Sequence, residues 1–161
     1  MKIVYIDSQN VHKALENYHN WIIDWKKFFV YLKEKYKADK VKIFFGYVCK
    51  HKFFYQSLGK IGFEVCFKET LVLPNGEIKG NVDIDIAIIA LIDFYEYSVS
   101  NAYLVTGDGD YNSLILFWIE KGVFGKVFVP GINNSSVLLK KVAKQNIIDL
   151  IPMKNKLQKN S

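Results

Sequence analysis

The chain contains no arginine, so all 22 of its cationic side chains are lysines. A lysine meets a phosphate as a point charge, without the bidentate fork with which arginine reads a guanine edge. If nucleic acid binds, contacts to its backbone should outweigh base reading. The sequence also lacks an uninterrupted apolar run of about 18 residues, and its N-terminus turns polar after Ile6, too early for a signal peptide. We therefore expect a cytoplasmic protein with no membrane partner.

Cysteine is scarce, and recognised nucleophile and cofactor motifs are missing. Cys49 and Cys66 lie far apart, without the CxxC spacing of a zinc or redox site, and we interpret them as reduced core residues. The sequence has no GxSxG nucleophile elbow, no Walker A loop and no complete dinucleotide-binding glycine motif. Chemistry based on a side-chain nucleophile or a nucleotide cofactor is therefore disfavoured.

Lysine is also absent from one continuous segment, residues 80–120. This segment carries seven acidic residues and no lysine, a charge of −7, whereas the whole chain has a formal net charge of +6, so the remainder carries +13. Several of these acids adjoin apolar runs, where an unpaired charge is costly to bury. A bound cation at an acidic centre would remove that cost. We expect Asp93 and Glu96, however, to lie on a solvated face.

Strand-like and helix-like segments alternate along the chain. Short apolar runs predict buried strands, and apolar residues at spacings of three and four predict amphipathic helices. The expected strands cover residues 2–6, 41–48, 63–68, 102–106, 126–129 and 146–151, and the expected helices cover residues 22–37, 50–60, 83–97, 111–121 and 135–144. This alternation predicts one α/β domain over residues 1–150, with a mainly parallel sheet covered on both faces.

Two further segments fall outside this alternation. Residues 70–82 contain a Pro-Asn-Gly turn, which predicts a hairpin or a flexible lid beside the acidic segment. Residues 151–161 are rich in lysine, asparagine and glutamine, and we expect a disordered tail.

The acids at strand and helix ends are the candidate metal ligands. Asp7 and Asp108 each follow a predicted strand, and Asp83 opens a helix, so all three should reach the carboxyl edge of the sheet, where α/β proteins bind ligands. Asp110 lies in the same turn as Asp108. Oxygen ligands without histidine or cysteine favour Mg²⁺ or Mn²⁺. Asp85 would add a ligand only if the first helical turn were irregular.

Each of these acids also has a purely structural interpretation. Asp7 could cap a helix, Asp83 could complement a helix dipole, and Asp108 and Asp110 could be ordinary turn residues. Lys79, just before the acidic helix, is either a phosphate contact or a solvated lysine. The joint occurrence of the four acids favours a shared metal site.

Three segments together resemble the NYN domain of the PIN-like superfamily, including its LabA-like branch. They are Asp7-Ser8-Gln9-Asn10, Lys79-Gly80-Asn81-Val82-Asp83 and Thr106-Gly107-Asp108-Gly109-Asp110-Tyr111. The resemblance covers about residues 1–150 and implies a three-layer Rossmann-like PIN-type fold and a Mg²⁺- or Mn²⁺-dependent ribonuclease. Carried over by position, Asp7, Asp83, Asp108 and Asp110 would be the metal-site acids, with Asn10 and Thr106 supporting water or phosphate.

The sequence supports three functional hypotheses. The first is a metal-dependent ribonuclease that hydrolyses phosphodiester bonds of single-stranded RNA with little sequence preference. The second is a catalytically impaired nucleic-acid-binding or protein-interaction module, because relatives often carry an aspartate where this chain has Ile89. The third is a magnesium phosphatase, which is disfavoured because Gln9 stands where a haloacid-dehalogenase motif needs a second aspartate. A homo-oligomer is compatible with all three.

Overall fold

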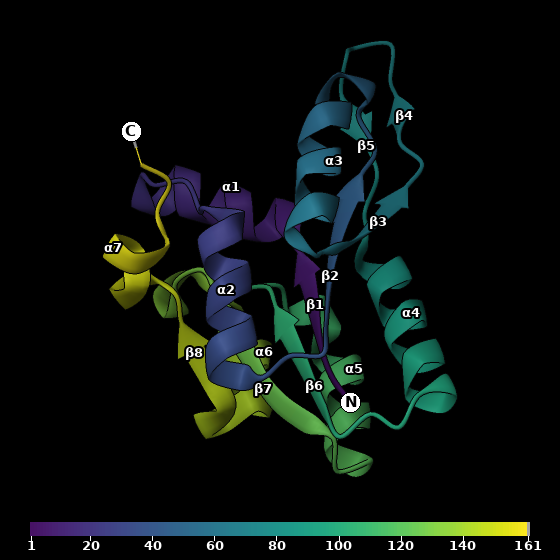
Figure 1. Cartoon of the computed structure of the whole chain (residues 1–161), viewed down its shortest axis with the longest axis vertical. Coiled ribbons are helices and arrows are strands. Elements are labelled where there is room, and N and C mark those ends of the chain that lie inside the picture. The colour runs from purple at the N-terminus through teal and green to yellow at the C-terminus, as the bar shows by residue number, and fades with distance from the viewer. Residues whose placement is uncertain (161) are drawn as a thin grey trace.

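A computed structural model describes residues 1–160, and within that range the chain forms a six-stranded parallel sheet (Figure 1). The strand order is β3-β2-β1-β6-β7-β8. The strands are β1 (Lys2–Asp7), β2 (Lys40–Gly46), β3 (Glu64–Lys68), β6 (Asn101–Val105), β7 (Phe124–Val129) and β8 (Ile147–Asp149). The expected α/β fold with a mainly parallel central sheet is confirmed.

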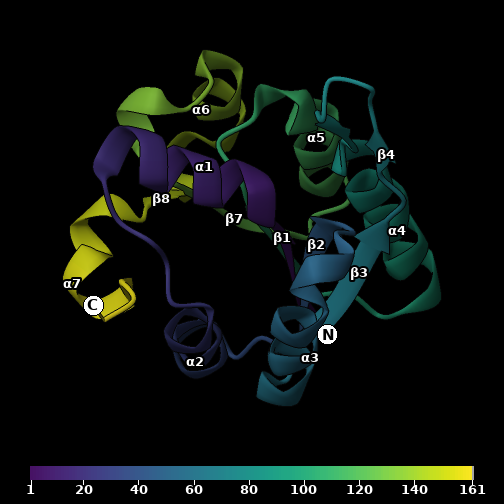
Figure 2. The ribbon, with the colours of Figure 1, turned by 90° about the horizontal axis from the view of Figure 1, so that it is seen from above.

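Helices cover both faces of this sheet, so the domain has three layers (Figure 2). One face packs against α1 (Ser8–His19), α2 (Trp25–Tyr36), α3 (Lys52–Ile61) and α7 (Lys154–Leu157). The other face packs against α4 (Asp83–Glu96), α5 (Asn112–Glu120) and α6 (Val137–Ala143). Each face has its own apolar core, because alternate residues of the strands point to opposite sides. Among the helices that the structure describes, none is long and apolar enough to cross a membrane.

The strand order reverses between β1 and β6. The chain first builds β1, β2 and β3 outward in one direction, then crosses the sheet through α4 and continues with β6, β7 and β8 on the other side of β1. Such a reversal leaves a crevice beyond the carboxyl ends of the two central strands, where ligands of doubly wound sheets bind. Asp7 ends β1, and Thr106 directly follows β6.

Short elements connect the main ones. Residues 70–82 form the expected hairpin, in which β4 (Leu71–Val72) pairs antiparallel with β5 (Ile78–Lys79). Single turns of 3-10 helix stand at Cys49–His51, Gly109–Tyr111, Ile132–Asn134, Lys144–Asn146 and Ile151–Met153. The interpretation of Cys49 as a core residue is wrong, since its side chain is exposed on one of these turns.

The expectation of disorder for residues 151–161 is wrong for most of that segment. After a 3-10 turn the chain forms α7, and Leu157 is fully buried against the core beside α2. The main chain then pairs with the α1–α2 connection, where the Lys159 amide donates to the Ile22 carbonyl at 2.8 Å. The polar composition of residues 151–161 gave no indication that Leu157 would pack in the core. Ser161 lies outside the described residues.

The expectation of a solvated Asp93 is also wrong, whereas Glu96 is exposed as expected. Asp93 lies on the buried side of α4, only 3 % exposed. Its carboxylate accepts a hydrogen bond from the Tyr5 hydroxyl at 2.8 Å and pairs with the buried Lys42 ammonium at 2.8 Å. A buried charge is tolerated when it is paired and hydrogen-bonded. The lysine partner lies 51 residues away in the sequence, so helix periodicity alone could not identify it.

Candidate metal centre

The first candidate ligand, Asp7, is placed by the junction of β1 and α1. It is the last residue of β1 and the N-cap of α1, and its Oδ1 accepts a hydrogen bond from the Asn10 amide at 3.2 Å. The side chain is only 4 % exposed. Burial raises the pKa of Asp7 to about 6, with smaller contributions from the charges of Asp83 and Asp108. The structure thus holds a carboxyl group that protonates near neutral pH at the end of a central strand.

A tight loop between β6 and α5 supplies two more acids, Asp108 and Asp110. The Asp108 Oδ1 atom accepts a hydrogen bond from the Asp110 amide at 2.9 Å, which begins the 3-10 turn. The loop is held from below, because the Thr106 hydroxyl accepts from the Asp108 amide at 3.2 Å. It is held from the side by Asn10, whose Oδ1 accepts from the Gly107 amide at 2.7 Å. Asn10 therefore ties the start of α1 to the acidic loop.

This loop requires glycine at position 109 for steric reasons. A Cβ atom there would collide with the hydroxyl of Ser136, the residue that caps α6. The Ser136 amide in turn donates to the Gly107 carbonyl at 3.1 Å. The start of α6 therefore lies tightly against the loop and fixes its path. Glycine here permits a close approach between two segments.

The fourth acid, Asp83, opens α4 on the other side of the crevice. Asn81 orients it, since the Asn81 side-chain amide donates to Asp83 Oδ2 at 2.9 Å. Asp83 also contributes favourably to α4 through the helix dipole. Asp7 therefore caps α1 and Asp83 complements the dipole of α4, as considered from the sequence. These structural roles apply in addition to the clustering of the acids.

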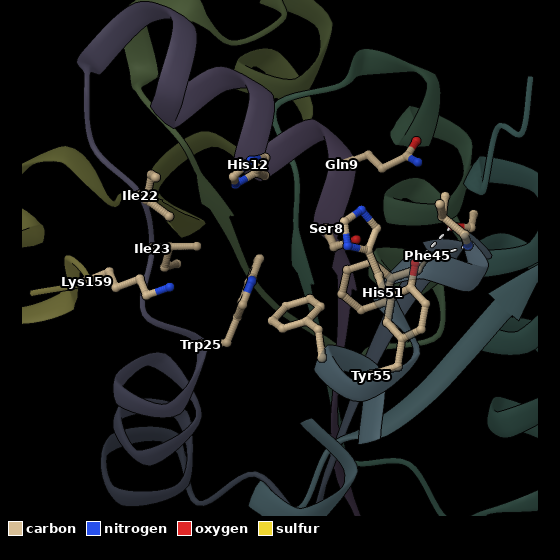
Figure 3. Close-up of a pocket in the computed structure, with 13 residues that line it drawn as sticks. Ser8, Gln9, His12, Ile22, Ile23, Trp25, Phe45, His51, Tyr55 and Lys159 are labelled. Atoms are coloured by element: carbon tan, nitrogen blue, oxygen red, sulfur yellow. Dashed lines mark hydrogen bonds between the residues drawn. The ribbon is translucent and has the colours of Figure 1, made fainter. Parts of the chain in front are cut away.

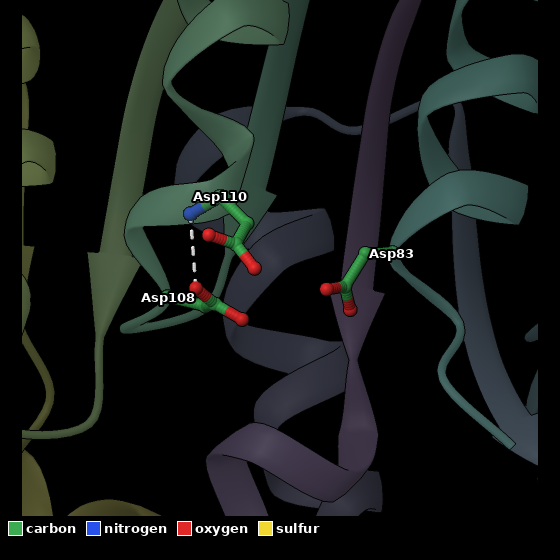
Figure 4. Close-up of side chains that lie close together, drawn as sticks. All are labelled: Asp83, Asp108 and Asp110. Atoms are coloured by element: carbon green, nitrogen blue, oxygen red, sulfur yellow. Dashed lines mark hydrogen bonds between the residues drawn. The ribbon is translucent and has the colours of Figure 1, made fainter.

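The structure brings Asp83, Asp108 and Asp110 together across the crevice (Figure 4). Each offers a carboxylate oxygen, and the three oxygens lie within 4.8 Å of one another. Asp7 adjoins this group through Tyr111, whose hydroxyl oxygen lies 3.1 Å from Asp7 Oδ2 and 3.3 Å from Asp83 Oδ1. We call these four acids the carboxylate cluster.

No lysine offsets the charge of the carboxylate cluster. Among residues 1–160, none of its four members forms a salt bridge within 4.0 Å. Carboxylates held this close repel one another, and the charges of Asp83 and Asp108 add to the effect of burial in raising the pKa of Asp7. A set of hard oxygen donors without histidine or sulfur fits Mg²⁺ or Mn²⁺ better than zinc. The cluster can therefore accommodate a divalent metal ion.

The remaining predicted site residues lie outside the carboxylate cluster. Asp85, expected as an additional ligand, instead pairs with Lys68 at 2.9 Å, because α4 is regular from its first residue and turns this side chain away. Lys79 is exposed on β5 of the hairpin. Asn10 and Thr106 both support the acidic loop through hydrogen bonds to its main chain.

The sequence analysis placed Tyr111 in the acidic motif but did not identify a role for its hydroxyl group. The ring is 2 % exposed and packs in the apolar core, yet the hydroxyl contacts two members of the carboxylate cluster. Burial raises the pKa of Tyr111, and the neighbouring negative charges of Asp7 and Asp83 raise it further. The hydroxyl therefore keeps its proton and acts as a donor. Its position directly after Gly-Asp-Gly-Asp was the available sequence signal.

Comparisons with known proteins identify the family and the fold. A family model described as NYN domain matches residues 2–150. The crystal structure of a protein of unknown function from Vibrio parahaemolyticus superposes with a TM-score of 0.79 at 20 % sequence identity, covering 98 % of this chain and 95 % of the other. At that identity the likeness shows a shared fold. A search of curated proteins finds no match.

Proposed function

Because the chain belongs to the NYN domain family, which has a nuclease-type fold, we propose that it is a metal-dependent endoribonuclease acting on single-stranded RNA. The carboxylate cluster is the observation that supports this proposal most. Three chain segments, each remote from the others in sequence, direct acidic side chains to one crevice at the point of strand reversal. None of these acids has a cationic partner among the residues described. We also propose that the protein is cytoplasmic, a location that suits an RNA substrate.

In this proposal Asp83, Asp108 and Asp110 would hold Mg²⁺ or Mn²⁺, with Asp7 beside them. When bound, such an ion activates water and stabilises negative charge on the phosphate. Tyr111 donates its hydroxyl proton toward Asp7 Oδ2, which fixes the orientation of that carboxylate. Asn10 and Thr106 hold the acidic loop, so the distance between Asp108 and Asp83 is set before substrate arrives.

The charge distribution favours a nucleic-acid substrate. Three members of the carboxylate cluster lie in the acidic segment 80–120, whereas the rest of the chain has a net charge of +13 and contains all 22 lysines. Lysines attract the phosphate backbone without discriminating strongly between bases. Lys79 is exposed on the hairpin that precedes α4, and we propose that it contacts substrate phosphate. Little sequence preference is therefore expected.

Cleavage of labelled single-stranded RNA tests the proposal. With Mn²⁺ or Mg²⁺ the protein should shorten the RNA, and EDTA should stop the reaction. Asp108→Asn should reduce the rate at least about a hundredfold, since it removes one proposed ligand. Glu96→Gln is the matched control, because it neutralises an exposed carboxylate at the other end of α4. Cleavage that survives both EDTA and Asp108→Asn refutes the mechanism.

The alternative is an RNA-binding or protein-interaction module without turnover. Ile89, the position where relatives often carry an aspartate, packs against the apolar core and so contributes no ligand. This alternative predicts salt-sensitive RNA binding and little affinity for metal. Calorimetric titration with Mn²⁺ separates the two, since a nuclease should bind the ion and lose that binding in Asp108→Asn.

A further inference from the structure

A cavity lies beside the first turn of α1 (Figure 3). Its volume is about 450 Å³, within the range of small-ligand pockets. It is bounded by α1, the α1–α2 connection, the first turn of α2, the end of β2, the start of α3 and the C-terminal segment. We call it the aromatic pocket, because Trp25, Phe45, Phe54 and Tyr55 line it.

The aromatic walls are held in place by neighbouring groups. The rings of Phe45 and Tyr55 lie 5.1 Å apart, and Trp25 packs in the core at the start of α2. The Tyr55 hydroxyl accepts a hydrogen bond from the Val48 amide at 3.2 Å, which anchors α3 to the segment after β2. Fixed aromatic surfaces of this kind bind flat rings by stacking, with little preference for one base.

Donors surround the aromatic pocket, and carboxylates are absent from its lining. Its polar side chains are those of Ser8, Gln9, His12, His51 and Lys159, and the described residues that line it include no aspartate or glutamate. Of these groups, His12 lies 3.3 Å from the exposed Glu16. Lys159 contributes a full positive charge. Such a lining suits a ligand that carries an apolar ring together with phosphate.

Residues of the aromatic pocket directly follow a residue of the carboxylate cluster in the sequence. Asp7 belongs to the cluster, whereas the next two residues, Ser8 and Gln9, line the pocket. Consecutive Cα atoms are about 3.8 Å apart, so the Cα atoms of Asp7 and Gln9 are less than about 8 Å apart. A strand of RNA with one phosphate at the cluster can therefore direct a flanking base around the start of α1.

We propose that the aromatic pocket binds a nucleobase of single-stranded RNA next to the phosphate at the carboxylate cluster. This inference rests on the proposed ribonuclease function and specifies how the substrate is held. Duplex RNA would be a poor substrate, because its paired and stacked bases are not free to enter a pocket. The pocket thus selects unpaired RNA by shape and stacking while leaving the base sequence largely unread.

Filling the pocket tests the proposal with a matched pair of variants. Ile22→Trp introduces a bulky ring at a lining position that is 45 % exposed, and Ile119→Trp introduces the same ring on α5 at 45 % exposure, outside the pocket. Binding is measured by fluorescence anisotropy in EDTA, in an Asp108→Asn background, with two labelled probes. One is a single-stranded RNA 12-mer, and the other is an abasic oligomer of the same length.

Ile22→Trp should weaken binding of the RNA probe about tenfold, the order expected from losing one stacked base. Ile119→Trp should leave it unchanged, and the abasic oligomer should bind both variants equally. Thermal unfolding checks that both variants fold. His51→Ala, an exposed change at the rim, serves as a second test and should weaken binding of the RNA probe more than binding of the abasic probe.

Two results overturn the inference: RNA affinity unaffected by both Ile22→Trp and His51→Ala, or an equal loss for the RNA and abasic probes. Either result leaves the ribonuclease proposal standing if Asp108→Asn still abolishes cleavage. Conversely, cleavage that persists in Asp108→Asn and EDTA refutes the ribonuclease proposal itself, whatever the pocket variants do. The two failures are therefore distinguishable.

Discussion

The metal-free protein should lose stability as the pH rises through the range in which Asp7 ionises. The native-state pKa of Asp7 is raised from 3.8 to about 6, chiefly by burial. Between these values the native state binds more protons at Asp7 than the unfolded chain does, so stability falls as pH increases and levels off above about pH 6. A difference of about two pKa units corresponds to about 3 kcal/mol.

Asp7→Asn should remove this penalty while keeping an oxygen that can accept from the Asn10 amide. Urea unfolding in EDTA measures the free energy of unfolding of both proteins at about pH 4 and about pH 7.5. The difference between variant and parent should grow by about 2–3 kcal/mol in favour of the variant across that interval. Because the free energy of unfolding of the variant is compared with that of the parent, pH effects from groups that both proteins share cancel.

Added Mn²⁺ supplies the control. The ion should stabilise the parent at about pH 7.5 and should stabilise Asp7→Asn less, because binding favours the ionised carboxylate. If the stability difference between the two proteins does not change with pH, then Asp7 does not carry the unfavourable buried charge assigned to it. The electrostatic account of the carboxylate cluster would then be wrong.

Four further outcomes follow from the described contacts. Tyr111→Phe should fold normally and weaken Mn²⁺ binding about tenfold, measured by calorimetry, because it removes the hydroxyl that orients Asp7. Asp85→Asn should leave Mn²⁺ affinity unchanged in the same titration, since this carboxylate pairs with Lys68. Asp93→Ala should lower the free energy of unfolding in urea by about 3 kcal/mol, because it leaves the buried Lys42 ammonium with little compensation. A loss no larger than that of a typical surface substitution would contradict this. Leu157→Ala should lower the free energy of unfolding by about 3 kcal/mol, because it truncates a fully buried side chain. If the C-terminal segment were disordered, the substitution would leave stability unchanged.

The layered fold and its crevice could be predicted from the sequence because their signals are local. Apolar runs of strand length alternate with helical spacings, and this alternation leads to parallel strands covered on both faces. Two acids after strands, Asp7 and Asp108, and one at the start of a helix, Asp83, were then expected to meet at one edge. Asp83 and Asp108 offer carboxylate oxygens within 4.8 Å of each other, and the Tyr111 hydroxyl contacts both Asp7 and Asp83. The reasoning needed only the order of elements, because topology fixes which strand ends are neighbours.

Features that depend on distant partners could not be predicted in this way. Asp93 was assigned to a solvated face because Lys42, which compensates its charge, is far away in the sequence. The ordered C-terminal segment depends on the fit of Leu157 beside α2, which composition does not encode. The aromatic pocket likewise gathers residues from several helices and a connection, so its lining becomes visible only in three dimensions.

The central position of β1 has a consequence for how this molecule matures. One neighbour of β1, the strand β2, begins about 40 residues later in the sequence. The other neighbour, β6, begins about 100 residues later. Pairings between such distant segments are slow to form, because a long loop must close first. A nascent chain that has assembled only its first half would possess Asp7 but neither Asp83 nor Asp108. Under the proposed function, metal binding would then require both halves of the chain, and an incomplete polypeptide could not cleave RNA.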